Sequence, residues 1–383
     1  MRDLHLSDME ERTVQAGKAE GALPDREVNG LLEGLAAGRD LSNEAWQFLI
    51  AGEYDRKLLY AKADEVRRKH YGRDVYIRGL LEISSYCKND CLYCGIRRSN
   101  HKAQRYRLSE EEIVSCCEKG YSLGFRTFVL QGGEDAYFTT KRVAQIVSAI
   151  KGKYPDCAVT LSLGEREKKT YEAWYKAGAD RYLLRHETAS EAHYAKIHPP
   201  ELSYRHRMQC MEDLKQIGYQ TGCGFMVGSP FQSTQDLIAD MEFLREFQPH
   251  MVGIGPFIPH CETPFGEYAK GSLTQTLTMA ALTRLVLPKT LIPSTTALST
   301  IHPEGRQLGL QAGANVVMPN LSPARVRGQY SLYDHKRCTG DEAAEGLETL
   351  KCRVKDAGYE VVIDRGDSRL KPDNDVKYCR KKV

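Results

Sequence analysis

The stretch Cys87-Lys-Asn-Asp-Cys91-Leu-Tyr-Cys94-Gly-Ile-Arg-Arg-Ser-Asn100 organises the chain, because it gathers three cysteines at Cys-x3-Cys-x2-Cys spacing. It follows the largely apolar run 77–86, which predicts a buried strand that ends at the cysteines. Three thiolates from one short loop can bind three irons of a [4Fe-4S] cluster and leave the fourth iron without a protein ligand. An open metal position of this kind is where chemistry can take place, as it is in catalytic zinc sites.

A zinc knuckle is the alternative that these cysteines leave open. Zinc normally takes four ligands, and no fourth Cys or His stands at knuckle spacing. The nearest candidate is His101, seven residues beyond Cys94. A non-catalytic zinc-binding scaffold is therefore the non-enzyme alternative to a cluster enzyme, and iron and sulfide analysis would separate the two.

Composition describes an ordinary globular protein. Of its 383 residues, 41% are hydrophobic and 27% are charged, which is enough for a full core. The net charge of +3 is too small to indicate a nucleic-acid partner. No apolar run reaches the ~18 residues of a membrane span, and the charged segment 1–12 predicts no signal peptide. We expect a reducing, anaerobic cytoplasm, with the scattered Cys116, Cys157 and Cys223 as core residues.

The periodicity predicts a helical extension over residues 1–75, a barrel over 76–325 and a C-terminal extension over 326–383. Within the first part, Leu41–Ile50 with a Ser42 cap and Asp55–His70 are the expected helices. The C-terminal extension should hold a helix at Asp341–Gly358, a short strand at Glu360–Asp364 and a polar tail at Lys371–Val383. The first twenty residues have little to bury, and we expect them to pack loosely or to be disordered.

From residue 76 short apolar runs alternate with amphipathic ones. The expected strands are Ile77–Ser85, Thr127–Gln131, Ala158–Leu163, Arg181–Arg185, Thr221–Val227, Met251–Phe257, Thr290–Thr296 and Asn315–Pro319. The expected helices are Ser109–Leu123, Thr140–Lys153, Glu167–Ala177, Tyr204–Ile217, Thr234–Phe247, Leu277–Val286 and Glu304–Ala312. Eight β-then-α units predict an α/β fold, a complete (β/α)8 TIM barrel, since the alternative open sheet usually has five or six strands.

Polar residues follow the expected strands where each one ends. Strand two ends in Gln131-Gly-Gly-Glu134-Asp135, three in Ser162-Leu-Gly-Glu165, four in Arg185-His-Glu187-Thr188, six in Pro256-Phe-Ile-Pro-His260 and eight in Met318-Pro-Asn320. A barrel places its active site at the carboxyl ends of its strands. The convergence of these segments on the cysteine loop is therefore stronger evidence than any one of them.

The cysteine spacing with Tyr93 just before Cys94 resembles the radical S-adenosylmethionine (SAM) superfamily. The resemblance implies a [4Fe-4S] cluster on Cys87, Cys91 and Cys94, whose open iron is chelated by the methionyl amine and carboxylate of SAM. An electron from the cluster then cleaves the sulfonium to a 5′-deoxyadenosyl radical. It also implies that Gly132, Gly133 and Glu134 bind the methionyl amine.

Further SAM contacts follow from the same resemblance. Met226, in the glycine-containing run Gly224–Gly228, would flank adenine, although glycines that ease strand packing explain that run equally well. Arg207 could donate to the methionyl carboxylate and Glu187 could accept from the ribose. Arg185 and Glu187 should share a face of strand four by period-two alternation, and both are assigned to catalysis. Solvated charges remain the alternative for Arg207 and Glu187. The remaining cofactor candidates are Gln131, Thr160 and Ser162.

The resemblance narrows to HydE, the radical SAM maturases of [FeFe]-hydrogenase, over roughly residues 40–370. It rests on Gly95–Asn100 after the cysteines and on the segments 76–83, Leu183-Leu-Arg-His-Glu-Thr188, 251–260 and Ile292-Pro-Ser-Thr-Thr-Ala297. It implies an internal cavity lined by Thr295, Thr296, Met318 and Tyr330. The implied role is assembly of the dithiolate-bridged di-iron unit of the H-cluster from an iron–CO–cyanide–cysteinate precursor made by the maturase HydG.

Partners and siblings follow from the same resemblance. We expect a small organometallic or amino-acid-like substrate, a reductant such as ferredoxin or flavodoxin, and other hydrogenase maturases as partners. Methylornithine synthase and biotin synthase are the sibling alternatives. Biotin synthase uses an arginine on a late strand, where this chain has Thr295 and Thr296. Those hydroxyls, with Arg185, suit a small anion better than a long apolar substrate.

The chain departs from some HydE members near its C-terminus. Those members carry a second cluster on a Cys-x7-Cys-x2-Cys run, but here Cys338 is followed by Gly346 and Thr349 at the other two positions. Cys352 lies too far along to restore the spacing. We therefore expect one cluster per chain.

Overall fold

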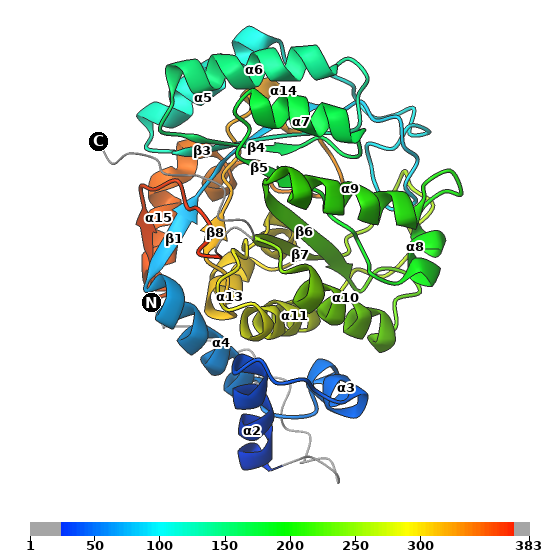
Figure 1. Cartoon of the computed structure of the whole chain (residues 1–383), viewed down its shortest axis with the longest axis vertical. Coiled ribbons are helices and arrows are strands. Elements are labelled where there is room, and N and C mark those ends of the chain that lie inside the picture. The colour runs from blue at the N-terminus through cyan, green and yellow to red at the C-terminus, as the bar shows by residue number, and fades with distance from the viewer. Residues whose placement is uncertain (1–23, 371–383) are drawn as a thin grey trace.

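The computed structural model describes residues 24–370 (Figure 1). The expectations for the first twenty residues and for the polar tail lie outside the described residues. The helices are α2 Asp25–Ala36, α3 Asn43–Ala51, α4 Arg56–Tyr71, α5 Glu110–Ser122, α6 Thr140–Lys153, α7 Lys168–Lys176, α8 Glu191–Ile197, α9 Tyr204–Ile217, α10 Thr234–Phe247, α11 Leu273–Val286, α12 Thr296–Ile301, α13 Gly305–Gln311, α14 Ala324–Arg327 and α15 Leu347–Asp356. The strands are β1 Asp74–Ile77, β2 Gly79–Ser84, β3 Thr127–Gly132, β4 Ala158–Ser162, β5 Arg181–Leu183, β6 Gln220–Val227, β7 Met251–Pro256, β8 Val316–Val317 and β9 Glu360–Val362.

Six strands form a parallel sheet in the order β2-β3-β4-β5-β6-β7, so each βα unit adds its strand beside the previous one. A second parallel sheet has the order β8-β1-β9. Single parallel bridges continue the pairing between the two sheets. They join Met251 to Leu291, Pro293 to Val316 and Asn320 to Leu80. The fold is thus α/β with parallel strands, as predicted, and the carboxyl ends of β2 to β7 meet at one edge.

Several expected boundaries were wrong, each for a local reason. The strand expected at Ile77–Ser85 is two strands, β1 and β2, separated at Arg78. The strand expected at Thr290–Thr296 makes only the single bridges at Leu291 and Pro293, because proline has no N–H to donate and Thr296 already begins α12. The helix expected from Asp341 begins at Leu347, after the 3-10 turns η1 Gly340–Glu342 and η2 Ala344–Gly346.

Other boundaries agree with the sequence signals. Ser42 caps α3 by accepting from Ala45 N at 3.2 Å, and Ser109 begins α5 with a complete capping box. Helix α9 ends at Gly218, whose φ of 102° is the left-handed conformation that glycine adopts without strain. Helix termini were therefore easier to predict than the ends of the strands.

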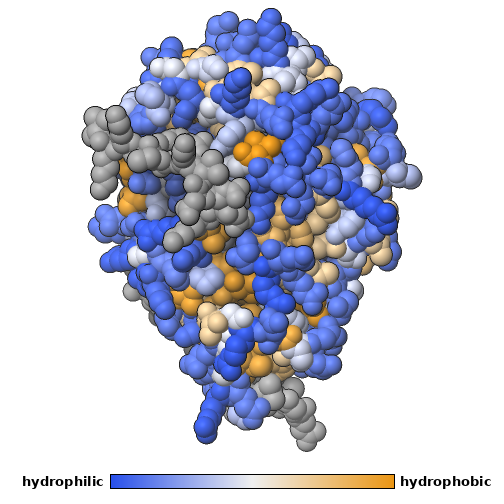
Figure 2. Space-filling view, viewed as in Figure 1, coloured by the Kyte–Doolittle hydropathy of each residue, from blue (hydrophilic) through white to orange (hydrophobic). Residues whose placement is uncertain are grey.

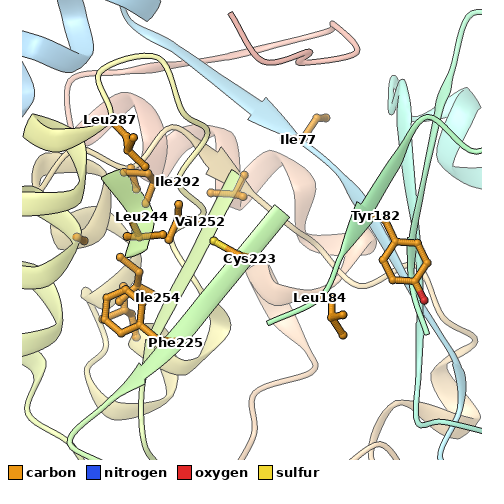
Figure 3. Close-up of a cluster of buried hydrophobic side chains, with 14 of the residues drawn as sticks. Ile77, Tyr182, Leu184, Cys223, Phe225, Leu244, Val252, Ile254, Leu287 and Ile292 are labelled. Carbon is orange, nitrogen blue, oxygen red and sulfur yellow. The ribbon is translucent and has the colours of Figure 1, made fainter. Parts of the chain in front are cut away.

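The apolar core includes a layer between β6, β7 and the helices that cover them (Figure 3). Phe225 of β6 and Ile254 of β7 lie near Leu244 of α10 in this view, all at most 2% exposed. Cys157 and Cys223 are fully buried, as expected of core cysteines, whereas Cys116 is only half-buried. Packing of this kind fixes the strands and so places the loops at their ends.

The N-terminal helices and the C-terminal segment both pack on this α/β unit. Helix α4 lies along α11, and α3 packs against α10, with Trp46 and Leu49 buried. At the other end of the chain, β9 pairs with β1 and residues 364–370 continue across the amino ends of the strands. There Arg181 donates to Arg365 O at 2.8 Å and to Asp367 Oδ1 at 2.6 Å. The amino ends of the strands are thus covered by the chain's own C-terminal segment.

The face shown in Figure 2 is largely hydrophilic, with apolar residues gathered towards its middle. Within residues 24–370, no helix has both the length and the apolar character that crossing a bilayer would demand.

Candidate functional site

The cysteine loop follows β2 at the carboxyl edge of the sheet and is tied to two other loops. Leu92 N donates to Ile197 O at 3.2 Å, and Gly95 N donates to Leu332 O at 2.8 Å. The segment has no regular secondary structure, so its shape depends on contacts of this kind. The three thiols are held by contacts that come from segments far away in the sequence.

Arg105 gives this loop most of its internal support. Its guanidinium donates to the carbonyl oxygens of Ser85 (2.5 Å), Ile96 (2.8 Å), Arg97 (2.7 Å) and Asn100 (3.1 Å). Four carbonyls converging on one guanidinium fix the path of the chain around the cysteines. Sequence reasoning missed this residue, because nothing in the local pattern separates it from the other arginines nearby.

The three thiols are close enough to influence one another's charge but do not all lie within 4.8 Å of one another. Burial raises the pKa of Cys91 well above its usual range and that of Cys94 to about 12, and the neighbouring cysteine thiols add to both shifts. Two thiolates on one zinc would lie about 3.8 Å apart. The sulfur atoms of Cys87, Cys91 and Cys94 do not form such a close group. Within residues 24–370, the metal-binding atoms that do all lie within 4.8 Å of one another belong to other residues. This spread fits three separate irons of a cluster better than a zinc knuckle.

The Gly132-Gly133-Glu134 turn lies directly against the cysteine loop. A Cβ at Gly133 would come within 2.2 Å of Tyr86 O and 2.8 Å of the Cys87 Cβ, so only glycine allows this approach. The Glu134 carboxylate is buried, and its Oε1 accepts from Glu165 N at 2.9 Å. Its Oε2 accepts no hydrogen bond, although Lys88 Nζ lies 3.2 Å away. A buried carboxylate oxygen beside the cysteines is thus left able to accept from an ammonium group.

Arg185 and Glu187 lie together, but not for the reason expected from the sequence. Strand β5 ends at Leu183, and Glu187 has a φ of 67°, so the predicted period-two alternation does not extend this far. The left-handed backbone costs about 1–3 kcal/mol for a residue other than glycine. Arg185 Nη2 lies 3.1 Å from Glu187 Oε2, and neither atom makes an aligned hydrogen bond. Strain and unpaired buried atoms coincide at this position, as they do at functional sites.

Arg207 is held at the site by Glu165. Its Nε donates to Glu165 Oε1 at 2.5 Å, and its Nη1 donates to Arg185 O at 2.7 Å. Burial by itself would lower the pKa of Arg207, but Tyr194 and Glu165 raise it well above its usual value. The guanidinium is therefore a fixed positive charge. The sequence placed Glu165 at the end of an expected strand near the site but predicted no role for it.

Tyr93 and Met226 contribute an apolar wall. They belong to a cluster with Ile197, Phe257 and Phe265. The Tyr93 hydroxyl lies 3.1 Å from His198 Nε2, which orients the ring. A flat apolar wall beside charged groups is suited to a molecule with one aromatic part and one zwitterionic part.

The three remaining cofactor candidates, Gln131, Ser162 and Thr160, lie at different positions along β3 and β4. Gln131 and Ser162 are paired in register at the carboxyl ends of these strands. Thr160 is two residues nearer the amino end, where its unpartnered Oγ1 is buried and it lines a small cavity with Arg78 and Arg181. Thr160 is therefore brought together with the residues at the amino ends of the strands.

The predicted cavity residues are partly separated as well. Thr295 Oγ1 is buried without a partner, but Thr296 donates to Glu342 Oε2 at 2.9 Å and so is already engaged. Met318 packs against the apolar cluster that contains Met251. Tyr330 is 3% exposed; burial raises the pKa of its hydroxyl well above the usual value, with Glu82 and Cys94 adding to the shift. Of the four predicted cavity residues, Thr295 has a hydroxyl without a hydrogen bond, and Tyr330 lies close enough to Cys94 to be affected by its charge.

The comparisons with known proteins agree with this geometry. The sequence profile of the radical SAM superfamily matches residues 81–244. The chain is 47% identical over 313 residues to the [FeFe] hydrogenase maturase subunit HydE of Thermotoga maritima, covering 82% of this chain and 88% of that protein. It is 30% identical over 335 residues to the 3-methylornithine synthase of Methanosarcina acetivorans, covering 86% of this chain and 92% of that one.

Solved structures show the same architecture. The crystal structure of methylornithine synthase (PylB) superposes with a TM-score of 0.76 at 26% identity, covering 87% of this chain and 97% of that one. The [FeFe]-hydrogenase maturase HydG of Carboxydothermus hydrogenoformans superposes with a TM-score of 0.72 at 22% identity, covering 95% of this chain and 85% of that one. At this low identity the second likeness concerns the fold alone.

Proposed function

Because the chain belongs to the HydE family of the radical SAM superfamily, we propose that it acts in assembly of the [FeFe]-hydrogenase active site. It is an enzyme that uses a [4Fe-4S] cluster and SAM, as its superfamily does. When bound, the cluster supplies the electron that cleaves SAM to a 5′-deoxyadenosyl radical. The observation that carries the proposal is the group of three thiols beside the buried Glu134 Oε2, which accepts no hydrogen bond.

The chain's own groups then bind and orient SAM. Glu134 Oε2 accepts from the methionyl ammonium, and Arg207, fixed by Glu165, faces the carboxylate. Met226 and Tyr93 enclose the adenosyl part in the apolar cluster they share. Glu187 Oε2, which accepts no hydrogen bond from the protein, is available to the ribose hydroxyls. Each assignment uses an atom that is either unpaired or held rigid by a buried partner.

The substrate is a small anionic molecule, such as the iron–CO–cyanide–cysteinate precursor made by HydG. Arg185 supports this proposal, since its Nε makes no hydrogen bond and its Nη2 has only the Glu187 carboxylate 3.1 Å away. Thr295 Oγ1, also unpaired, is a second donor for a carboxylate or cyanide group. Thr296 has a smaller part than the sequence predicted, because Glu342 occupies its hydroxyl.

We also propose that the strands close into a complete (β/α)8 barrel over 76–325, between an N-terminal helical extension described over 24–75 and a C-terminal extension described over 326–370. The single bridges from β7 through Leu291 and Pro293 to β8, and from Asn320 back to β2, support this closure. The expected partners are a ferredoxin- or flavodoxin-like reductant and the other maturases. A reducing cytoplasm suits the cysteines, all of which are free thiols where the structure describes them.

A defined maturation mixture tests the function. Leaving the protein out should abolish activation of the hydrogenase, and supplying a preformed di-iron dithiolate should restore it without the protein. The similarity to 3-methylornithine synthase identifies the rival activity. If activation proceeds equally well without the protein while the chain converts lysine to methylornithine, the proposal fails and the sibling activity replaces it.

A further inference from the structure

Three metal-binding side chains that the radical SAM site does not use meet near the cysteine loop. His260 and Cys261 follow β7, and Asp334 comes from the loop before η1. Asp334 Oδ1 lies 3.5 Å from Cys261 Sγ and 3.8 Å from His260 Nδ1. In the described part of the chain, this is the group whose ligand atoms all lie within 4.8 Å of one another.

No hydrogen lies between His260 Nδ1 and Asp334 Oδ1, so these two atoms make no hydrogen bond with each other. Glu262 N donates to His260 Nδ1 at 3.1 Å, so Nδ1 is the nitrogen that carries the lone pair. Facing it is a carboxylate oxygen, which also carries only lone pairs at neutral pH. The thiol hydrogen of Cys261 is the single hydrogen available among the three atoms, and it points to Asp334. Nδ1 and Oδ1 are thus two acceptors 3.8 Å apart with no hydrogen between them, and a cation bound by both would be attracted to each.

The distances match the edges of a tetrahedral site. Ligand bonds of about 2.0–2.3 Å place nitrogen and oxygen about 3.3 Å apart and sulfur and oxygen about 3.5 Å apart. The observed 3.8 Å and 3.5 Å lie within about 0.5 Å of these two edges, and the third pair, His260 Nδ1 and Cys261 Sγ, lies within 4.8 Å. We propose that His260, Cys261 and Asp334 bind a divalent ion of borderline softness, zinc or ferrous iron, with water in the fourth position. On binding, Cys261 loses its thiol proton to solvent and Nδ1 gives up the bond from Glu262 N.

The position gives the site a structural consequence. Asp334 N already donates to Pro259 O at 3.0 Å, so the two loops are in register before any ion binds. The His260 ring lies against Gly95, where a Cβ would come within 2.2 Å of the imidazole. Gly95 in turn donates to Leu332 O in the same loop as Asp334. An ion here clamps both loops over the residue that follows Cys94.

Zinc added to the anaerobically reconstituted holoenzyme tests the site. After gel filtration we expect about one zinc per chain, and zinc-edge X-ray absorption should show one sulfur and three nitrogen or oxygen neighbours. Cys261→Ser and Asp334→Asn should weaken zinc binding more than about tenfold, the loss that even outer-shell changes cause. Cys352→Ser, which removes an exposed cysteine on α15, should leave zinc binding unchanged.

The opposite results are equally clear. No retained zinc, zinc retention unaffected by Cys261→Ser and Asp334→Asn, or a shell of three or more sulfurs from the cluster loop would each overturn the proposal. The visible absorption of the cluster checks that the variants are intact, and the zinc-edge spectrum of the wild-type protein decides alone if a variant precipitates. SAM cleavage by Cys261→Ser should persist, so failure of this site and failure of the proposed function are distinguishable.

Discussion

Two arginines at opposite ends of β5 have opposite surroundings. Arg181, the first residue of the strand, uses all its nitrogens: it donates to Gln220, Thr127 Oγ1, Arg365 O and Asp367. Arg185, two residues beyond the end of the strand, has Nε and Nη2 buried without a hydrogen bond. Arg181 is thus fully hydrogen-bonded, whereas Arg185 has an ion pair with Glu187 but no aligned hydrogen bond from Nε or Nη2.

This contrast separates stability from function. A buried donor without a hydrogen bond costs about 1–3 kcal/mol, so each such group calls for an explanation. At the carboxyl ends, Glu134 Oε2 and Thr295 Oγ1 also lack a hydrogen bond, and Glu187 Oε2 has only its ion pair with Arg185. The amino ends are not free of such groups, since Arg78 Nε is also unpaired, but there the C-terminal segment supplies most partners. We infer that changes at the carboxyl ends alter activity and that changes at the amino ends alter folding.

The largest effect should come from Cys91→Ser. Removing one of the three thiols leaves the cluster with only two protein ligands. The reconstituted protein should therefore lose its iron and no longer release 5′-deoxyadenosine from SAM. The thermal stability of the apoprotein should stay the same, because Cys91 lies in a loop supported by Arg105. Iron analysis and product chromatography measure both properties. Full turnover by this variant would show that these thiols are not the cluster ligands.

Glu134→Gln should weaken SAM binding on the order of tenfold to a hundredfold. The amide keeps the shape but removes the charge that a methionyl ammonium would meet, and a hydrogen bond to a charged group contributes about 1.5–3 kcal/mol. Equilibrium binding of SAM to the reconstituted protein is the measurement, with iron content as the control. An unchanged affinity would remove Glu134 from the cofactor site.

Arg185→Met should lower substrate processing about tenfold and change SAM binding less. Methionine keeps the apolar stem but cannot donate to an anion. The readout is hydrogenase activation per cluster in the defined mixture, beside SAM affinity. Arg181→Met is the matched control: it should lower stability instead, since Arg181 holds Asp367 at 2.6 Å. If both variants lose activity and stability alike, the contrast between the two ends of β5 is wrong.

Asp367→Asn should lower stability by about 1–2 kcal/mol, or a few degrees in melting temperature, and leave activity per folded chain unchanged. The side chain is 43% exposed, which keeps the effect modest. Burial alone would raise its pKa, but Arg181 and Arg365 hold the pKa well below its usual range.

The pH dependence of that effect has a definite sign. Because the pKa of Asp367 is lower in the folded protein, its contribution is present above about pH 4 and disappears as the pH falls through the folded pKa. The melting temperatures of wild type and Asp367→Asn should therefore differ at pH 7 and converge in acid. A constant difference across that range would contradict the ion pairs.

The sequence predicted what depends on short spacings and missed what depends on distant contacts. Three cysteines within eight positions and Gly-Gly-Glu after a buried run predicted two segments that the structure brings into contact. Arg105 was missed because its role consists of four carbonyls that only the folded loop brings together. Glu187 was placed on a strand by alternation, but its φ of 67° depends on its pairing with β6, which no local pattern encodes.

The smallest expected effect concerns Cys338, where some HydE members begin a second cluster. Here Gly346 and Thr349 stand at the other two positions, so the run of three cysteines is incomplete. Cys338→Ala should therefore leave iron content near one cubane per chain and SAM cleavage intact, because one thiol cannot hold a cluster. Cys91→Ser serves as the positive control for loss of iron. Two clusters in the wild type, falling to one in Cys338→Ala, would show that this loop has a functional role. Further ligands, such as Cys352, would then have to reach the cluster through a rearrangement of α15.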